Sequence, residues 1–481
     1  MKYFKILLSS VFFLSLFSCQ KVIEVKETDF IGGDIALLTV ENNEQGVIGA
    51  YTQMNIDMSI LLNATFSDEV KVGEFNNAGT THEWQFTSTD IGIRDNFTAI
   101  TPFYRLIDRV NRVLVALPNA QAMNGASDEA VRSRVKGEAL FLRAFAHFEL
   151  YRYYSGSADP NALAMAYKET PSLTGEARIS VRDYFQKLKA DLTEAKNLLP
   201  EYASASVARA SKLAATGLQA RVALYLKEWK DAITYSTEYI NALPLASRAN
   251  FPGIWTDANN SEVAFKLVRS ASNARVGSLF RATSSKHATT GDTLIGTVSW
   301  IVSDKLWNSY DKDNDIRFTT YLKDEPLLSK NSRPSHIVHK YRGGGYTSAT
   351  ENMNDIKVFR TAEMYLIRAE AKAETDDLLG AAADLNELRA ARITGYVPEI
   401  FLSKDALINA IINERFKELA YEGHRFWDLR RRNLPVERLA TDAPAANATV
   451  LPAGNFRFVL PIPNSEIQAN PLIQQNPGYS N

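Results

Sequence analysis

The chain of 481 residues contains one cysteine, Cys19, so it cannot form an intramolecular disulfide bond. It also lacks an excess of charge of one sign, with 54 basic and 55 acidic residues, and this balance excludes a general electrostatic attraction to nucleic acid or to an anionic lipid surface. Hydrophobic residues still make up 45% of the chain, which is enough for large buried cores. We therefore expect a globular protein that is stabilised by packing and has no nucleic-acid partner.

Long apolar segments are absent except near the start. Residues 6–17 are mostly apolar, yet a helix of this length is too short to span the ~30 Å core of a bilayer. Two lysines precede this stretch and a serine stands directly before Cys19, a pattern typical of a bacterial lipoprotein signal. The sequence predicts a signal peptide over residues 1–18, a lipid on Cys19 and a tether over residues 19–40. An ordinary secretory signal with an incidental cysteine, or a short transmembrane anchor, is the alternative.

Catalytic signatures are absent as well. The six histidines include one close pair, His336 and His339, which has neither the spacing nor the glutamate of a zinc protease helix. The chain has no Gly-x-Ser-x-Gly nucleophile motif and no phosphate-binding Gly-Lys-Ser/Thr loop. Acidic residues alternate over 311–315 as in a calcium loop, but Ile316 replaces the required glycine and Leu322 the required glutamate. We predict no enzymatic activity, no catalytic residues, no cofactor and no bound metal.

Helical periodicity dominates what is present. Apolar residues recur at three-to-four spacing over residues 102–118, which predicts an amphipathic helix. Residues 135–154 predict a second helix that is rich in aromatic residues, and its simplest explanation is a core helix. These two segments indicate a mainly α fold.

Two further segments each predict a pair of helices, residues 211–243 and residues 361–392. Ala220 and Ala232 in the first pair have the same twelve-residue offset as a second pair of alanines, Ala369 and Ala381. Ala232 and Pro244 have the spacing of the second-helix alanine and the terminal proline of a tetratricopeptide repeat, although the early tryptophan and leucine of that repeat are missing from the first pair. We predict a tetratricopeptide-like helical-repeat scaffold, an α-α superhelix, over about residues 100–250 and 356–432.

Between the helical blocks the composition changes. Residues 63–96 and 251–355 are rich in Ser, Thr, Asn, Asp and Gly, which predicts loops and short strands that form the ligand-binding face. Prolines alternate with polar residues near the C-terminus, which predicts an extended strap over residues 455–481. We expect all of these parts to form a single domain over residues 41–481.

Several motifs, taken in order, resemble the SusD/RagB family of outer-membrane lipoproteins from Bacteroidetes-type bacteria. The most extensive matches are residues 363–371, residues 412–431 with Tyr421-Glu422-Gly423-His424-Arg425-Phe426-Trp427-Asp428, and Pro461-Ile462-Pro463 followed by Asn476-Pro477-Gly478-Tyr479. Shorter matches are Gly49-Ala50-Tyr51, Ser67-Asp68-Glu69, Val110-Asn111-Arg112, residues 137–144 and Asp315-Ile316-Arg317. Each match alone is weak, but their number and order are specific.

The resemblance implies a non-catalytic binding protein. It implies a lipid-anchored protein of the outer membrane, at the cell surface, that binds an oligosaccharide or polysaccharide and delivers it to a SusC-like TonB-dependent transporter. The RagB branch of the family binds oligopeptides instead, and the residues do not decide between the two ligands. A lipoprotein glycoside hydrolase and a structural adaptor without a small ligand are further alternatives.

Three glutamates, Glu414, Glu418 and Glu422, recur every four residues and would lie on one face of a helix. Like charges at this spacing repel each other unless cations lie beside them. Four arginines nearby in sequence can supply the charge: Arg415, Arg425, Arg430 and Arg431. We predict a buried network of Glu–Arg ion pairs that joins helices.

Aromatic residues in polar loops are the candidates for a sugar site, because a pyranose ring stacks on a flat aromatic face while amides and arginines reach its hydroxyls. Trp84 is the first candidate, with Asn77 and Arg94 nearby in sequence. Trp300 and Tyr346 follow, both in the loop-rich middle of the chain. For each aromatic residue the alternative is a hydrophobic pin that only holds its loop.

Overall fold

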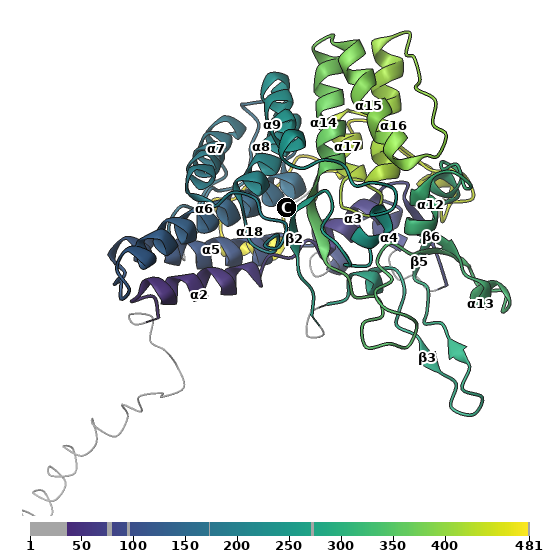
Figure 1. Ribbon diagram of the computed structural model, residues 1–481, viewed down its shortest axis with the longest axis horizontal. Coiled ribbons are helices and arrows are strands. Elements are labelled where there is room, and N and C mark those ends of the chain that lie inside the picture. Colours follow the sequence, from purple (N-terminus) through teal and green to yellow (C-terminus); the bar gives the residue numbers. More distant parts are fainter. Residues whose placement is uncertain (1–35, 75–78, 94–96, 173, 271–273, 480–481) are drawn as a thin grey trace, which may run out of the picture.

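The computed structural model describes residues 36–74, 79–93, 97–172, 174–270 and 274–479 (Figure 1). The predicted signal peptide over residues 1–18, Cys19 and most of the predicted tether lie outside these residues. In the part of the chain that is described, no helix combines the length and the apolar character that crossing a membrane requires.

The described structure is mainly helical, with short strands that pair two by two. Its longer helices are α2 (Val40–Tyr51), α3 (Asp57–Phe66), α5 (Ile100–Ala116), α6 (Ala126–Tyr154), α7 (Val181–Leu198), α8 (Lys212–Leu226), α9 (Trp229–Ala242), α14 (Thr361–Glu374), α15 (Leu378–Arg392) and α16 (Lys404–Glu418). Helices α2 and α5 to α9 form one half of the molecule, and α14 to α16 stand side by side at one end of the other half (Figure 1).

Helix α5 confirms the amphipathic helix predicted over 102–118 with a shift of two residues at each end. Its apolar stripe, including Phe103, Leu106 and Val110, is buried against α6. Helix α6 begins nine residues before the predicted start at Val135, because its first turns are polar and carry no apolar period. From Val135 onward almost every side chain of α6 is buried, since α2, α5 and α7 all pack on it.

The two predicted helix pairs are confirmed as α8 with α9 and α14 with α15. Ser211 caps α8 through a hydrogen bond from Ala214 N, and Asp377 caps α15 through one from Gly380 N. Lys227 ends α8 in the left-handed conformation, and only Glu228 separates it from the start of α9. Helix α14 packs on both α9 and α15, so the two pairs lie against each other.

The strands are short and antiparallel. The pairs are β1 (Val70–Val72) with β5 (Trp300–Val302), β2 (Val263–Leu267) with β8 (Ile356–Arg360), β3 (Ser285–Lys286) with β4 (Thr293–Leu294), β6 (Leu322–Asp324) with β7 (His336–Val338), and β9 (Val436–Glu437) with β10 (Val450–Leu451). Most of them lie in residues 251–355, where the sequence predicts loops and short strands. The hairpin of β3 and β4 projects from the edge of the molecule (Figure 1).

The predicted network of buried glutamates and arginines exists, and we call it the α16 ion cluster. Glu414 pairs with Arg317 at 2.6 Å and with Arg389 at 2.7 Å. Glu418 lies within 3.2 Å of three guanidinium groups, those of Arg317, Arg360 and Arg392. Glu422 completes the cluster through Arg360 at 2.6 Å and Lys340 at 2.7 Å.

The predicted partners of these glutamates are wrong. Arg415 pairs with Asp428, Arg425 with Asp68 and Arg431 with Glu370. The true partners come from strand β8 and from helices α12 (Ile316–Tyr321) and α15, which tertiary packing brings to α16. Asp315, which the sequence places in a calcium-like loop, caps α12 and holds Arg317 at 2.7 Å.

The predicted strap is described to residue 479 and is partly helical. It contains the 3₁₀ turn η6 (Phe456–Phe458) and the helix α18 (Asn464–Ala469). Its two limbs are joined by Gln475, whose side chain donates to Ile462 O (2.8 Å) and accepts from Ile462 N (2.9 Å). Leu460 N donates to Tyr153 O (3.0 Å), so the strap is also fastened to the end of α6.

Candidate functional site

Trp84, the first predicted sugar contact, does not present a free ring. Its side chain is 4% exposed, and its indole Nε1–H donates to Phe66 O at 2.8 Å. The guanidinium of Arg438 lies 4.1 Å from the ring centroid and stacks on it. The exposed face that the prediction requires is therefore missing, because tertiary packing makes this residue a pin between α3 and the segment around Arg438.

Trp300 is buried in the same way. It belongs to strand β5, opposite Val72 on β1, and its side chain is 6% exposed. His82 meets its ring edge-on with a centroid separation of 5.0 Å. Trp300 consequently belongs to the packing of the strand pair, and its ring is covered.

Tyr346 keeps part of its surface open and stays a predicted ligand contact. Its hydroxyl hydrogen-bonds the carboxylate of Glu325, and Arg281 and Lys323 lie 5.1 Å and 5.6 Å from its ring centroid. Two cations near the ring leave less area for a sugar than the sequence suggests. Asn77 and Arg94, the remaining predicted contacts, lie outside the described residues.

A pocket lies between the C-terminal strap and the end of α6, away from these predicted residues, and we call it the strap pocket. Its volume is about 710 Å³, which is within the range of small-molecule sites. The loop after α6 forms one wall, with Gly156 and Leu163, and the strap forms the other, with Phe456 and Gln474. The side-chain amides of Asn433 and Gln474 are exposed and make no hydrogen bond within the described part of the chain, so they are available to a polar ligand.

Arg178 builds one side of the strap pocket. Its Nε–H donates to Ala164 O (2.7 Å), and its Nη2–H groups donate to Tyr154 O (3.0 Å) and Leu163 O (3.1 Å). The Nη1–H groups reach the strap at Gln474 O (3.1 Å) and Asn476 Oδ1 (2.8 Å). Arg178 therefore clamps the strap to the loop after α6 through neutral acceptors.

Arg430, on helix α17 (Arg425–Arg431), forms the floor. Its Nη1–H groups donate to Arg152 O (2.7 Å) and Phe458 O (3.1 Å), whereas Nε and Nη2 have no hydrogen-bond partner among the described residues. The guanidinium lies flat against Gly156, since a Cβ at that position would be 2.1 Å from Cζ. Gly156 has a φ of 73°, so both its backbone and its missing side chain permit this contact.

Among the residues that the structure describes, no aspartate or glutamate lines the strap pocket. Burial lowers the pKa of Arg178 and of Arg430 to about 10, and no carboxylate opposes this effect at either residue. Both side chains stay cationic at neutral pH, so the pocket is electropositive. Such a pocket can hold polar or anionic groups and contains no acid–base pair for hydrolysis.

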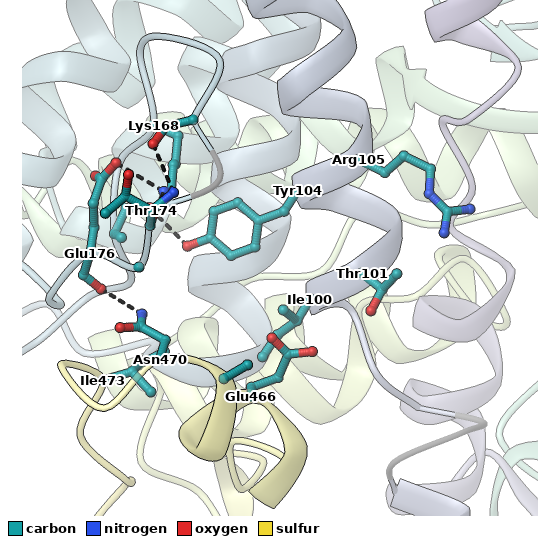
Figure 2. A pocket seen from close by; sticks show the side chains of 14 residues that line it. Ile100, Thr101, Tyr104, Arg105, Lys168, Thr174, Glu176, Glu466, Asn470 and Ile473 are labelled. Carbon is teal, nitrogen blue, oxygen red and sulfur yellow. Dashed lines mark hydrogen bonds and ion pairs between the residues drawn. The ribbon is translucent and has the colours of Figure 1, made fainter. Parts of the chain in front are cut away.

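A second pocket of about 400 Å³ lies along α5 on the other side of the strap, and we call it the α5 pocket (Figure 2). Tyr104 points into it, and Lys168 pairs there with Glu176 at 2.9 Å. Asn470 Nδ2–H donates to Glu176 O at 2.9 Å and so ties the strap to this wall. Glu466 lies at the mouth, where burial raises the pKa of its carboxyl. In contrast to the strap pocket, this pocket carries charges of both signs.

The described residues contain no cluster of three or more His, Cys, Asp or Glu side chains that could hold a metal ion. Histidines with a lowered pKa are explained by burial, and His147 is an example: burial lowers its pKa to about 3 while its ring stacks on Tyr167 at 3.8 Å. Such a group is part of the core and not a base in a cleft.

Sequence reasoning missed the strap pocket because its walls come from three distant segments. The prolines around Pro461 and Pro477 predict the strap itself. They do not reveal that it closes over Arg178 and Arg430, which lie in the loop after α6 and on α17. Both arginines also have an acid two positions earlier in the sequence, Glu176 and Asp428, so no local signal marks them as unpaired.

Two family models match the chain. Residues 37–224 match a family described as "Starch-binding associating with outer membrane", and residues 313–479 match the "SusD family". Together they cover α2 to α7, most of α8, α14 to α17 and the strap, including Arg178 and Arg430.

Relatives and solved structures match nearly the whole chain. "SusD-like protein P38" of Formosa agariphila is 24% identical over 512 aligned positions, which cover 96% of each chain. A SusD superfamily protein from Bacteroides thetaiotaomicron superposes with a TM-score of 0.76 at 23% identity, over 91% of this chain and all of that one. A laminarin-binding SusD-like protein superposes with a TM-score of 0.72 at 22% identity, over 91% of this chain and 99% of that one. These structural likenesses establish the fold, a mainly helical SusD-like fold with short strand pairs.

Proposed function

We propose that this chain, which belongs to the SusD family, binds a carbohydrate in the strap pocket and delivers it uncleaved to a SusC-like TonB-dependent transporter. The family is one of non-catalytic carbohydrate-binding proteins, and one of the two matching families is described as associating with the outer membrane. The observation that carries the choice of site is the strap pocket itself, which is large enough for an oligosaccharide and offers unbonded amides beside an aromatic wall.

The scaffold in this proposal is tetratricopeptide-like. Helix pairs α8–α9 and α14–α15 pack in sequence on one another, which is the arrangement that stacked helical repeats use. Such a frame is stiff, so it would hold the strap and the loop after α6 at a fixed separation around the ligand.

The membrane anchor in this proposal is a lipid on Cys19, and it places the protein at the cell surface. A Cys19→Ala variant should bind the ligand in solution as well as the unchanged protein, because the strap pocket lies in the folded body. Cells that carry this variant should take up the glycan more slowly. Normal uptake without the anchor would contradict the tethered arrangement.

The ligand is tested by screening the mature protein against neutral and acidic glycans and against oligopeptides, using affinity electrophoresis followed by titration calorimetry. We expect micromolar binding of a glycan and an unchanged chain length of that glycan after incubation. Binding of oligopeptides alone would assign the protein to the RagB-like branch, and release of shorter sugars would contradict a non-catalytic function.

The site is tested with Gln474→Ala, which removes an exposed amide without disturbing the backbone acceptor that Arg178 uses. Loss of one hydrogen bond of about 0.5–1.5 kcal/mol predicts a two- to tenfold weaker affinity and an unchanged melting temperature. Gln468→Ala, an exposed glutamine outside both pockets, is the matched control. If Tyr346→Ala weakens binding and Gln474→Ala does not, the ligand lies in the loop-rich half instead.

A further inference from the structure

Buried arginines in this protein almost always have a carboxylate partner. Every arginine that is buried in the described part of the chain forms an ion pair, except Arg178 and Arg438. Arg438 stacks on Trp84 and lies in the field of Asp68 and Asp442, which raise its pKa against the effect of burial. Arg178 has no such carboxylate, and neither has Arg430, which lines the same pocket.

Two uncompensated cations in one pocket are costly, because a buried charge without a counter-charge loses its hydration and gains little in return. Hydrogen bonds to backbone carbonyls satisfy Arg178 but leave its charge in place. At Arg430 two nitrogens lack even such a partner. An anion in the pocket would supply the negative charge that a carboxylate supplies at almost all of the other buried arginines.

We propose that the strap pocket takes a sugar bearing an anionic substituent, a carboxylate or a sulfate, whose charge is met by Arg178 and Arg430. This inference rests on the proposed function and specifies its ligand class. The amides of Asn433 and Gln474 would hold hydroxyl groups of the same sugar, and the wall around Phe456 would hold its apolar face.

The two arginines contribute differently. Each guanidinium nitrogen of Arg178 already donates to an acceptor on α6, on the loop after it or on the strap, so this residue acts on the ligand through its charge. Arg430 is half-buried, and its unbonded Nε and Nη2 lie against Gly156, out of contact with solvent. It therefore also acts by charge unless its side chain turns toward the ligand. Because both effects are electrostatic, added salt weakens the preference for an anionic sugar.

The α5 pocket provides a contrast within the same molecule. Its cation Lys168 is already paired with Glu176, and Glu466 adds a further carboxylate. An anionic sugar would meet repulsion there as well as attraction. The inference therefore applies to the strap pocket and not to the neighbouring one.

The test compares acidic with neutral sugars by calorimetry on the mature protein, and one pair of probes shares a backbone and differs only in charge. The probes are hexagalacturonate, the same hexamer with its carboxyl groups reduced to alcohols, a sulfated carrageenan hexamer and neutral laminarihexaose. We expect at least one acidic probe to bind at least tenfold more tightly than both neutral probes, with a smaller ratio at 0.5 M salt. The hexagalacturonate and carrageenan arms distinguish carboxylate from sulfate recognition.

Arg430→Gln removes the charge and keeps hydrogen-bond donors, and Arg430→Lys keeps the charge. We expect Arg430→Gln to reduce the acidic-to-neutral affinity ratio at least fivefold, and Arg430→Lys to retain most of it. Arg112→Gln, an exposed arginine on α5 outside both pockets, makes the same change in net charge and should leave the ratio unchanged. Melting temperatures establish that all three variants fold.

Three other outcomes would overturn the inference, and each has a different consequence. Equal affinities for acidic and neutral sugars would overturn it and leave carbohydrate binding in place. An equal loss in Arg430→Gln and Arg112→Gln would assign the preference to overall charge. Binding of peptides with a free C-terminal carboxylate, but of no glycan, would overturn both this inference and the proposed function.

Discussion

The α16 ion cluster and the strap pocket both bury arginine side chains, but only the cluster supplies carboxylates for them. Burial alone would lower the pKa of Arg317, yet Glu414 and Asp315 raise it well above its ordinary value. In the strap pocket burial lowers the pKa of Arg430 to about 10 without any carboxylate to oppose it. The cluster thus holds its counter-charges within the described part of the chain, whereas the two pocket arginines have none there, and we propose that a ligand supplies it.

The same distinction explains which charges hold the fold together. In the cluster each cation joins elements that are far apart in sequence, as Arg360 on β8 joins Glu262, Glu418 and Glu422. In the pocket the arginines hold backbone carbonyls, so their charge contributes little to joining elements. Mutations should therefore affect stability mainly at the cluster and binding mainly at the pocket.

The largest effect is expected from Arg360→Met in the cluster. It leaves three buried carboxylates without one of their cations, and breaking a buried pair in this way costs about 3–5 kcal/mol. Urea denaturation of the mature protein measures the loss. Arg112→Met, which removes an exposed i,i+4 pair, is the control and should change the unfolding free energy by less than about 0.5 kcal/mol. Similar losses in the two variants would mean that the cluster does not stabilise the fold.

Trp84→Ala should cost about 3 kcal/mol, because it removes a buried indole and exposes the Arg438 guanidinium that stacks on it. Arg438 differs from the arginines of both the cluster and the pocket, because it is buried against an aromatic ring. Thermal unfolding followed by circular dichroism gives the measurement. An unchanged melting temperature together with weaker glycan binding would restore Trp84 as the sugar contact that the sequence predicts.

Glu69 is the acidic counterpart of Arg430, a buried carboxyl that forms no ion pair among the described residues. Burial raises its pKa to about 8, well above the ordinary 4.5. Because the folded state holds this proton more tightly, its contribution to stability is complete below pH 4.5 and is lost as the pH rises toward 8. Glu69→Gln should therefore flatten the decline of the unfolding free energy between pH 5 and 8. An identical slope in the unchanged protein and the variant would show that Glu69 does not titrate in this range.

The smallest stability effect is expected from Arg430→Gln. It weakens hydrogen bonds to two carbonyls, each contributing about 0.5–1.5 kcal/mol, but it also removes an unpaired buried charge. We expect the unfolding free energy to stay within about 1 kcal/mol of the unchanged protein in urea titrations. A loss of unfolding free energy as large as that of Arg360→Met would mean that Arg430 stabilises the fold as much as Arg360 does, and would contradict the difference between pocket and cluster.

Local features of the fold could be predicted from the sequence. The period of the apolar residues located α5, because an amphipathic helix buries one stripe whatever it packs against. The spacing of Glu414 and Glu418 predicted an ion network for an equally local reason. Its partners could not be predicted, since Arg317 lies 97 residues from Glu414 and only the packing of α12 on α16 joins them.

The site could be predicted less well, because exposure is a property of the folded molecule. Trp84 stands in polar sequence and is buried all the same, since Phe66 and Arg438 reach it from other segments. The strap pocket shows the converse. Arg178 and Arg430 look ordinary in sequence, and they form one wall and the floor of a single pocket only when the strap closes over them.

Hydrogen–deuterium exchange of the mature protein, with and without a saturating glycan found in the binding screen, locates the bound ligand directly. We expect slower exchange in residues 155–163, 454–459 and 474–477, which form the walls of the strap pocket. Protection confined to the loop-rich residues around Trp300 and Tyr346, with no change at the strap, would contradict binding in the strap pocket.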